Sequence, residues 1–430
     1  MAQSLPHEPG LPHEPGLQEL LPPELVQEVI SALPRQDIGH WRCSSRLLRD
    51  AFDASNTALS LHQMPHSAAS VLDLVRRSPR LASLATATWW GGVDWGPVLA
   101  SASASLRALR VGPLPDAGPP AAHRSTPNRA DMLPTIGASC GAVLRDLDVS
   151  TVSGIDDISG LAACTALERL NIHMAAMPTL DALASCRALR HVVMSSCHAL
   201  RDVRGLASSC TALTYLTLCG NDVDDLSPLT ACTALTHLDV SGTRVEDISP
   251  LTACTALQNL GVGDCSALTR GLHRLTAFAN LRSLDIQTCE HLSSLCFVSV
   301  CTALEKLVAF DCINLNGDLR PLEACPGLKK LYLGGCRGVA DIGVLTACTA
   351  LDHLDISSTR VADIGALAAC TALEYLDISC CDFVMDLAPL DACAALNQLA
   401  MYQAWPPGAV PPHELARFQA RHPDCMIFLE

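Results

Sequence analysis

The chain has 430 residues, of which 49% are hydrophobic, 17% are charged and only 4% are aromatic. This composition favours a buried core over disorder, and the length allows two or three domains or one repeat array. The formal net charge of −15 argues against a nucleic-acid backbone or an anionic membrane surface as the main partner. The sequence has neither the apolar core of a signal peptide nor eighteen consecutive apolar residues, so we expect a cytoplasmic or nuclear protein.

The first residues predict a tail followed by short helices. Within residues 1–18 the hexapeptide PHEPGL occurs twice, and its Pro and Gly content favours a disordered tail. Residues 19–53 then carry an apolar stripe with helical spacing that stops at Pro34. We therefore expect a small all-α module at 19–53.

The module at 19–53 also carries a recognisable motif. It contains Leu21-Pro22-x-Glu24-Leu25, followed by Ile30, Leu33-Pro34 and Asp37-Ile38. This pattern resembles the F-box, a three-helix module that binds the small adaptor subunit of cullin-type (SCF) ubiquitin ligases. One departure is Leu47, which stands where the family usually has tryptophan. The other interpretation is a helical cap for a repeat array. The resemblance implies adaptor-binding roles for Leu21, Pro22, Leu25, Ile30, Leu33 and Pro34.

Residues 54–143 predict degenerate repeats. Leu81-x-x-Leu84 and Leu106-x-x-Leu109-x-Val111 have strand patterns. Residues 112–131 are rich in Pro and Ala, which predicts a mobile loop before the regular repeats begin.

Residues 144–401 repeat one unit of 22 to 24 residues that begins L-x-x-L-x-L or a close apolar variant. The pattern and the period are those of leucine-rich repeats. The resemblance implies an α/β fold, a horseshoe-shaped solenoid with a parallel β-sheet on its concave face. The first leucine of the unit recurs at Leu144, Leu167, Leu189, Leu213, Leu235, Leu257, Leu281, Leu304, Leu328, Leu351, Leu373 and Leu396.

The 22 cysteines follow the repeat. Ten lie three residues before the next first leucine, where Phe278 replaces the cysteine in one unit, and six more hold the ninth position of longer units. A place that accepts Cys or Phe is a packing position, and no C-x-x-C occurs, so we expect no structural zinc and no cofactor. Eight aspartates are placed to cap the turn that follows the strand: Asp157, Asp202, Asp225, Asp247, Asp318, Asp341, Asp363 and Asp386.

The unit also predicts which side chains face a partner. Positions 1, 4 and 6 should face the core, so positions 3, 5 and 7 should face the concave side. All four tyrosines of the chain occupy such positions. Strand propensity alone could favour tyrosine there, but amphipathic rings on an exposed sheet are typical anchors of protein interfaces. The predicted target-binding residues are Tyr215, His237, Phe310, Lys330, Tyr332, His353, Tyr375 and Tyr402.

Residues 402–430 predict a helix and a strand that cap the last repeat. Pairs such as His237 with Asp239 and His353 with Asp355 suggest acid–base chemistry, but they recur because the unit recurs. The sequence contains no P-loop, no Gly-x-Ser-x-Gly and no His-Glu-x-x-His. We therefore expect no enzyme, but a substrate receptor of an SCF ubiquitin ligase that holds a protein target on its concave face. The alternative is a regulatory scaffold of a signalling enzyme, in which the N-terminal helices are only a cap.

Overall fold

The computed structural model describes residues 58–61, 68–86, 94–111, 131–152, 154–207, 211–402 and 410–429. The predicted tail at 1–18, the F-box-like module at 19–53 with its six adaptor-binding residues, and nearly all of the predicted loop at 112–131 lie outside these ranges. The proposals for those segments therefore stay predictions.

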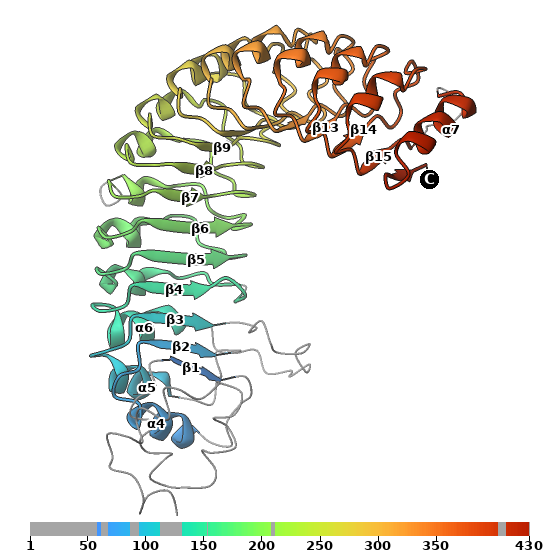
Figure 1. The fold of residues 1–430 in the computed structure, drawn as a ribbon. Coiled ribbons are helices and arrows are strands. Elements are labelled where there is room, and N and C mark those ends of the chain that lie inside the picture. Colours follow the sequence, from blue (N-terminus) through green and yellow to red (C-terminus); the bar gives the residue numbers. More distant parts are fainter. Residues whose placement is uncertain are drawn as a thin grey trace, which may run out of the picture.

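The described chain forms one parallel sheet of sixteen strands, and each strand pairs with the next one along the sequence (Figure 1). This is the sheet of a leucine-rich-repeat solenoid. The strands are β1 (Ala58–Leu61), β2 (Ser83–Thr86), β3 (Ala108–Val111), β4 (Asp146–Val149), β5 (Arg169–His173), β6 (His191–Ser195), β7 (Tyr215–Thr217), β8 (His237–Asp239), β9 (Asn259–Gly261), β10 (Ser283–Asp285), β11 (Lys306–Val308), β12 (Lys330–Tyr332), β13 (His353–Asp355), β14 (Tyr375–Asp377), β15 (Gln398–Ala400) and β16 (Met426–Phe428).

Helices cover the outer, convex side of the arc, and the strands line its inner, concave side (Figure 1). The first rungs carry the α-helices α4 (Ala68–Arg76), α5 (Trp95–Ala102) and α6 (Met132–Cys140), and α7 (Pro412–Arg421) follows the last regular rung. Between them every rung has a short 3₁₀ helix. These are η2 (Ser159–Ala163), η3 (Asp181–Ser185), η4 (Arg204–Leu206), η5 (Ser227–Ala231), η6 (Ser249–Ala253), η7 (Leu272–Ala277), η8 (Cys296–Val300), η9 (Arg320–Ala324), η10 (Gly343–Ala347), η11 (Gly365–Ala369) and η12 (Ala388–Ala392).

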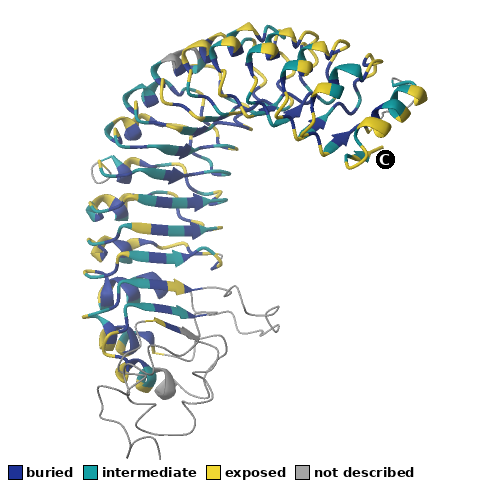
Figure 2. Cartoon of the chain, in the orientation of Figure 1, coloured by how far each residue is buried: buried dark blue, intermediate teal, exposed yellow. Residues whose placement is uncertain are grey.

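The repeat pattern accounts for the core. Leu216, Leu238 and Leu260 are register partners on three neighbouring strands, and each is at most 2% exposed. The first leucines of the twelve units are also buried, as are the residues at positions 4 and 6, so these positions form continuous buried columns along the array. In Figure 2 buried residues recur on successive strands. The residues at position 3 of every regular strand remain at least partly exposed, and so do those at position 5 of most strands, as expected for a strand with one buried face. At position 5 of four strands the residue is buried, namely Thr217, Val308, Asp355 and Ala400.

The eight predicted capping aspartates all accept a backbone hydrogen bond. In each, Oδ1 accepts from the backbone N–H two residues later, for example from Ser159 at 2.7 Å for Asp157 and from Gly365 at 2.7 Å for Asp363. The cap residue is the aliphatic one after the aspartate, so the aspartate lies one position earlier than a true N-cap. It closes a turn of the Asx type and satisfies the first N–H of the 3₁₀ helix. The other six bonds are made by Asp202, Asp225, Asp247, Asp318, Asp341 and Asp386.

The cysteines before each first leucine form a second buried column. Nine of the ten lie in the described residues and are fully buried, and Phe278 takes their place in one rung with 1% exposure. Six of these thiols donate to a carbonyl of the preceding rung, as where Cys393 donates to the Leu367 carbonyl at 3.3 Å. Cys164 and Cys301 instead donate to a carbonyl four residues earlier in their own rung. All twenty cysteines of the described residues are free thiols. Burial raises the pKa of seven thiols of the column, to about 12 for Cys370, so these seven stay neutral at physiological pH.

Two close backbone contacts join the α-helical rungs to the 3₁₀ rungs. A Cβ on Gly137 of α6 would lie 2.1 Å from the Gly160 carbonyl oxygen, and a Cβ on Gly160 would lie 2.1 Å from the Leu133 carbonyl oxygen. Neither position therefore has room for a side chain. The two glycines allow the backbone of α6 to touch that of η2 directly.

The eighth residue of most units has a left-handed backbone. Gly220, Gly242 and Gly335 have φ between 67° and 76° there. L-residues tolerate this conformation poorly, yet other rungs place them at the same position. The non-glycine examples are Met174, Ser196, Asp264, Thr288, Asp311, Ser358 and Cys380.

The C-terminal segment has the helix and strand expected from its sequence. Phe418 of α7 is fully buried against the last rung, and β16 pairs in parallel with β15. Within the described residues, no helix has the length and apolar character needed to span a membrane.

Candidate protein-interaction surface

The eight predicted target-binding residues all belong to the inner strands or directly follow them. Tyr215, His237, Lys330, Tyr332, His353 and Tyr375 lie on β7, β8, β12, β13 and β14, while Phe310 and Tyr402 follow β11 and β15 by two residues. Seven are half-buried and Tyr402 is 41% exposed. Seven of them fall into three groups along the concave face, here named the ring stack, the lysine patch and the C-terminal pair, and Tyr402 lies at the end of the rung that follows.

The ring stack consists of His191, Tyr215 and His237. The three are register partners on β6, β7 and β8. The Tyr215 ring lies 4.1 Å from each histidine ring, with interplanar angles of 14° and 3°. Burial lowers the pKa of both histidines, and the neighbouring Arg169 lowers that of His191 further, so the neutral rings dominate at neutral pH. The stack presents a row of ring edges with polar atoms to the concave side.

The lysine patch consists of Lys306, Phe310, Lys330 and Tyr332. The rings of Phe310 and Tyr332 are 5.4 Å apart and tilted by 40°. The Lys306 Nζ lies 6.0 Å from the centre of the Tyr332 ring, within the range of a cation–π contact. Lys306 and Lys330 are register partners on β11 and β12, so their side chains leave the sheet next to each other.

The C-terminal pair is His353 with Tyr375, whose rings are 5.9 Å apart on β13 and β14. Burial, followed by the nearby charges of Asp377 and Asp355, raises the pKa of Tyr375 to about 12. The Tyr375 hydroxyl donates to Asp377 at 3.4 Å. Tyr402 extends the aromatic surface at the end of the next rung.

The aspartates of the concave face support the backbone. Asp239 Oδ1 accepts from the Ser241 N–H at 2.9 Å, and Asp355 Oδ1 accepts from the Ser357 N–H at 2.9 Å. His353 Nδ1 lies 2.6 Å from Asp352 Oδ1, so its close carboxylate is that of the preceding residue. The pattern that suggested His353–Asp355 and His237–Asp239 pairs thus reflects a turn-forming aspartate repeated in several rungs.

Two glycines that were not among the predicted site residues lie between the ring stack and the lysine patch, one on β9 (Gly261) and one two residues beyond it (Gly263). Gly261 and Gly263 occupy positions 5 and 7 of one rung, where a Cβ would come within 2.6 Å of Asp239 Oδ1 and 2.9 Å of Asp285 Oδ1, respectively. The two carboxylates therefore lean over the glycines from the neighbouring strands. Burial raises the pKa of Asp285, and the charge of Asp239 contributes in the same direction. This feature could have been predicted from the sequence, because one unit has glycine at two of its concave positions.

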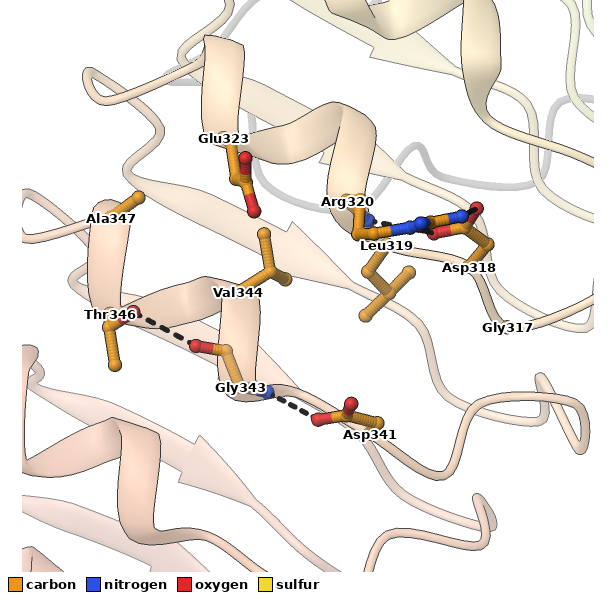
Figure 3. A pocket seen from close by; sticks show the side chains of 10 residues that line it. All are labelled: Gly317, Asp318, Leu319, Arg320, Glu323, Asp341, Gly343, Val344, Thr346 and Ala347. Carbon is orange, nitrogen blue, oxygen red and sulfur yellow. Dashed lines mark hydrogen bonds and ion pairs between the residues drawn. The ribbon is translucent and has the colours of Figure 1, made fainter.

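The convex side has an open hollow of about 620 Å³ between η9 and η10. On one wall Arg320 and Asp318 are paired with each other, with Arg320 Nη2 2.7 Å from Asp318 Oδ2 (Figure 3). On the other wall Asp341 accepts from the backbone N–H of Gly343, the first residue of η10, and Thr346 donates to the carbonyl of the same residue (Figure 3). Most polar groups that line this hollow are therefore already used in local contacts. Among the described residues, no three His, Cys, Asp or Glu side chains are arranged to hold a metal ion.

Comparison with protein families identifies the repeat. Residues 211–253, which contain β7 and β8, match the family model for leucine-rich repeats in two copies. No curated protein matches the sequence.

Two solved structures have a similar fold. One is the crystal structure of an internalin (inlF) from Listeria monocytogenes, with 19% identity, a TM-score of 0.60 and coverage of 85% of this chain and 93% of that chain. The other is a leucine-rich-repeat protein from Leptospira interrogans, with 12% identity, a TM-score of 0.60 and coverage of 85% and 95%. The chain therefore has the leucine-rich-repeat fold, and at these identities the likeness concerns the fold alone.

Proposed function

We propose that the protein is a non-catalytic binding protein that holds a protein target on its concave face. The observation that carries this proposal is the segregation of the tyrosines. The ring stack, the lysine patch and the C-terminal pair contain three of the four tyrosines of the chain, and the fourth, Tyr402, follows the inner strand β15. Half-buried tyrosine and histidine rings offer large contact areas that lose little conformational freedom on binding.

This proposal is tested with a phage-displayed library of random twelve-residue peptides, selected on the immobilised full chain. The concave variant is Tyr215→Ala with Tyr375→Ala. The control variant is Glu323→Ala with Thr346→Ala, which changes two exposed residues of the convex hollow. Selected peptides should bind the concave variant at least about tenfold more weakly, since truncating interface tyrosines typically costs more than about 1 kcal/mol.

The same peptides should bind the control variant within about twofold of the wild type. Thermal melts of both variants establish that the fold is kept. The proposal is wrong if no peptide is enriched on the wild type, or if both variants bind the selected peptides equally well.

We further propose that this binding serves a cytoplasmic or nuclear ubiquitin ligase of the SCF type, with residues 19–53 as the adaptor-binding module. The support is the F-box-like sequence Leu21-Pro22-x-Glu24-Leu25 with Leu33-Pro34. In this role the protein brings a target close to the catalytic subunits of other chains and needs no active site. The rival is a regulatory scaffold of a signalling enzyme, which short repeats of 22 residues also favour.

Co-purification with the SCF adaptor separates the two roles. The full chain should retain the adaptor, and Pro22→Ala with Leu25→Ala should abolish that retention, because both residues belong to the motif that contacts the adaptor in the F-box family. The matched control is Gln27→Ala with Glu28→Ala in the same segment, outside the motif. A wild-type chain that does not retain the adaptor, or a motif variant that retains it fully, would leave the scaffold role in its place.

A further inference from the structure

The lysines of the chain are unusual in number and place. The sequence has 26 arginines but only three lysines, and these are Lys306, Lys329 and Lys330. All three belong to two neighbouring rungs, on or next to β11 and β12.

Lys329 has a carboxylate partner, because its Nζ lies 2.8 Å from Glu305 Oε2 at the rim of the sheet. Lys306 and Lys330 have no such partner among the described residues. Of the other cations on the inner side, Arg169 is 2.9 Å from Asp146 and Arg110 is 3.5 Å from Asp148. Within the described residues, no carboxylate lies within ion-pair distance of Lys306 or Lys330.

The arrangement of Lys306 and Lys330 opposes folding. They are direct register partners on adjacent parallel strands, and strands in a sheet are about 4.8 Å apart. Like charges in neighbouring positions of a sheet destabilise it. Packing does not explain these lysines, because Lys306 is exposed and Lys330 is only half-buried. An anionic ligand between the two ammonium groups would remove their repulsion.

The surroundings of the two lysines favour a short acidic peptide as that ligand. Phe310 and Tyr332 lie beside the lysines and offer an apolar contact that a bare anion would not use. Asp285 on β10 and Asp355 on β13 border the patch on both sides, so a nucleic-acid strand with a charge on every phosphate would meet repulsion on either side. Two carboxylates on one face of an extended peptide fit the space that remains.

We propose that the lysine patch binds an extended acidic segment of the protein target, with acidic residues at i and i+2 on Lys306 and Lys330 and an apolar residue on Phe310 and Tyr332. This inference rests on the proposed function and specifies the chemistry of the target. Carboxylate groups at i and i+2 of an extended chain are about 6.6 Å apart, a separation that two flexible lysine side chains can match.

The experiment measures the fluorescence anisotropy of labelled synthetic peptides on the full chain at 50 and 300 mM salt. The probe contains Glu-Phe-Glu between Gly-Ser flanks, and its counterparts contain Lys-Phe-Lys or Glu-Ala-Glu. A twelve-nucleotide oligothymidine serves as the nucleic-acid probe. We expect Glu-Phe-Glu to bind at least about tenfold tighter than either peptide counterpart and the oligonucleotide, and to weaken at high salt, because salt screens exposed charges.

Lys306→Gln with Lys330→Gln should weaken binding of the Glu-Phe-Glu peptide at least about tenfold and remove most of its salt dependence. Lys306→Arg with Lys330→Arg keeps the charge and should bind within about threefold of the wild type. Lys329→Gln is the neighbouring control, since it removes one positive charge from the residue next to Lys330, and it should also stay within about threefold.

Three results would overturn the inference: tighter binding of the oligonucleotide, equal binding of the acidic and basic peptides, or unchanged affinity in the Lys306→Gln, Lys330→Gln variant. Library-selected peptides that depend on Tyr215 and Tyr375 but not on the two lysines would overturn this inference alone and leave the concave-face proposal standing. Peptides whose affinity is also unchanged by Tyr215→Ala with Tyr375→Ala would overturn both this inference and the concave-face proposal.

Discussion

We expect the protein to unfold when the pH is raised from 9 towards 11, because its core contains many neutral thiols. An exposed thiol has a pKa of 9.0, whereas burial raises the pKa of Cys348 to about 11 and that of Cys370 to about 12. The free energy that favours folding is therefore fully present below pH 9 and is lost as the pH rises towards the folded-state values. The same shift to about 11 or 12 applies to Cys140, Cys164, Cys254, Cys289, Cys301, Cys325 and Cys393.

The effect is large because it is repeated in nearly every rung. At pH 10 each such thiol should favour the unfolded state by about 1 kcal/mol, and nine of them together by on the order of 10 kcal/mol. That sum is comparable to the whole free energy of unfolding of an ordinary domain, about 5–15 kcal/mol. Far-UV circular dichroism between pH 7 and 11.5, with reductant present, measures the transition directly.

A double variant provides the control. Cys348→Ala with Cys370→Ala should be less stable than the wild type at pH 7.5, because alanine leaves a small cavity. Its free energy of unfolding, from urea titrations, should nevertheless fall less steeply above pH 9, by about 2 to 3 kcal/mol per pH unit, since two titrating groups are gone. If the urea midpoint does not change between pH 8 and 11, ionisation of the buried thiols does not destabilise the fold as expected.

The second large effect is expected from Gly160→Ala. The new Cβ would lie 2.1 Å from the Leu133 carbonyl oxygen and 2.5 Å from the Pro134 backbone nitrogen. Both are backbone atoms of α6, so the clash is relieved only if the helix moves away from η2. We expect a loss of about 3 kcal/mol or more in the free energy of unfolding, at the upper end for overpacking. Urea unfolding followed by circular dichroism measures the loss.

Gly327→Ala is the matched control for Gly160→Ala. No heavy atom lies within 4 Å of the Cβ that alanine would place there. This variant should differ from the wild type by no more than about 0.5 kcal/mol. In Gly160→Ala, hydrogen exchange should rise first in α6 and β4, because each rung of a solenoid is held mainly by its neighbours. Equal stability of the two glycine variants would show that the α6–η2 contact is dispensable.

The repeated features of this fold were predictable from the sequence because each is set within a single unit. Every regular strand begins two residues after a first leucine, as β7 does after Leu213. The buried cysteine column and the aspartate turns follow the same register. Alternation along a strand also placed the predicted tyrosines and histidines on the concave face.

Features that depend on several units at once were not predictable in this way. The ring stack requires His191, Tyr215 and His237 to adopt matching side-chain conformations on three strands, and only their positions were visible in the sequence. The close contact of Gly137 with Gly160 joins an α-helix to a 3₁₀ helix, a difference that apolar spacing does not reveal. The left-handed backbone at the eighth residue of the unit, by contrast, could have been predicted, because Gly220, Gly242 and Gly335 all occupy that position.

The sequential order of the strands also makes the concave surface a molecular ruler. His237 of the ring stack and Lys306 of the lysine patch lie on β8 and β11, three steps of about 4.8 Å apart. Duplication or loss of one whole unit during evolution would change this separation by a single step, and the buried leucines of the remaining units would still pack in register. The distance between the ring stack and the lysine patch can therefore change in steps of one strand spacing to fit a bound segment, while the residues of both groups stay the same.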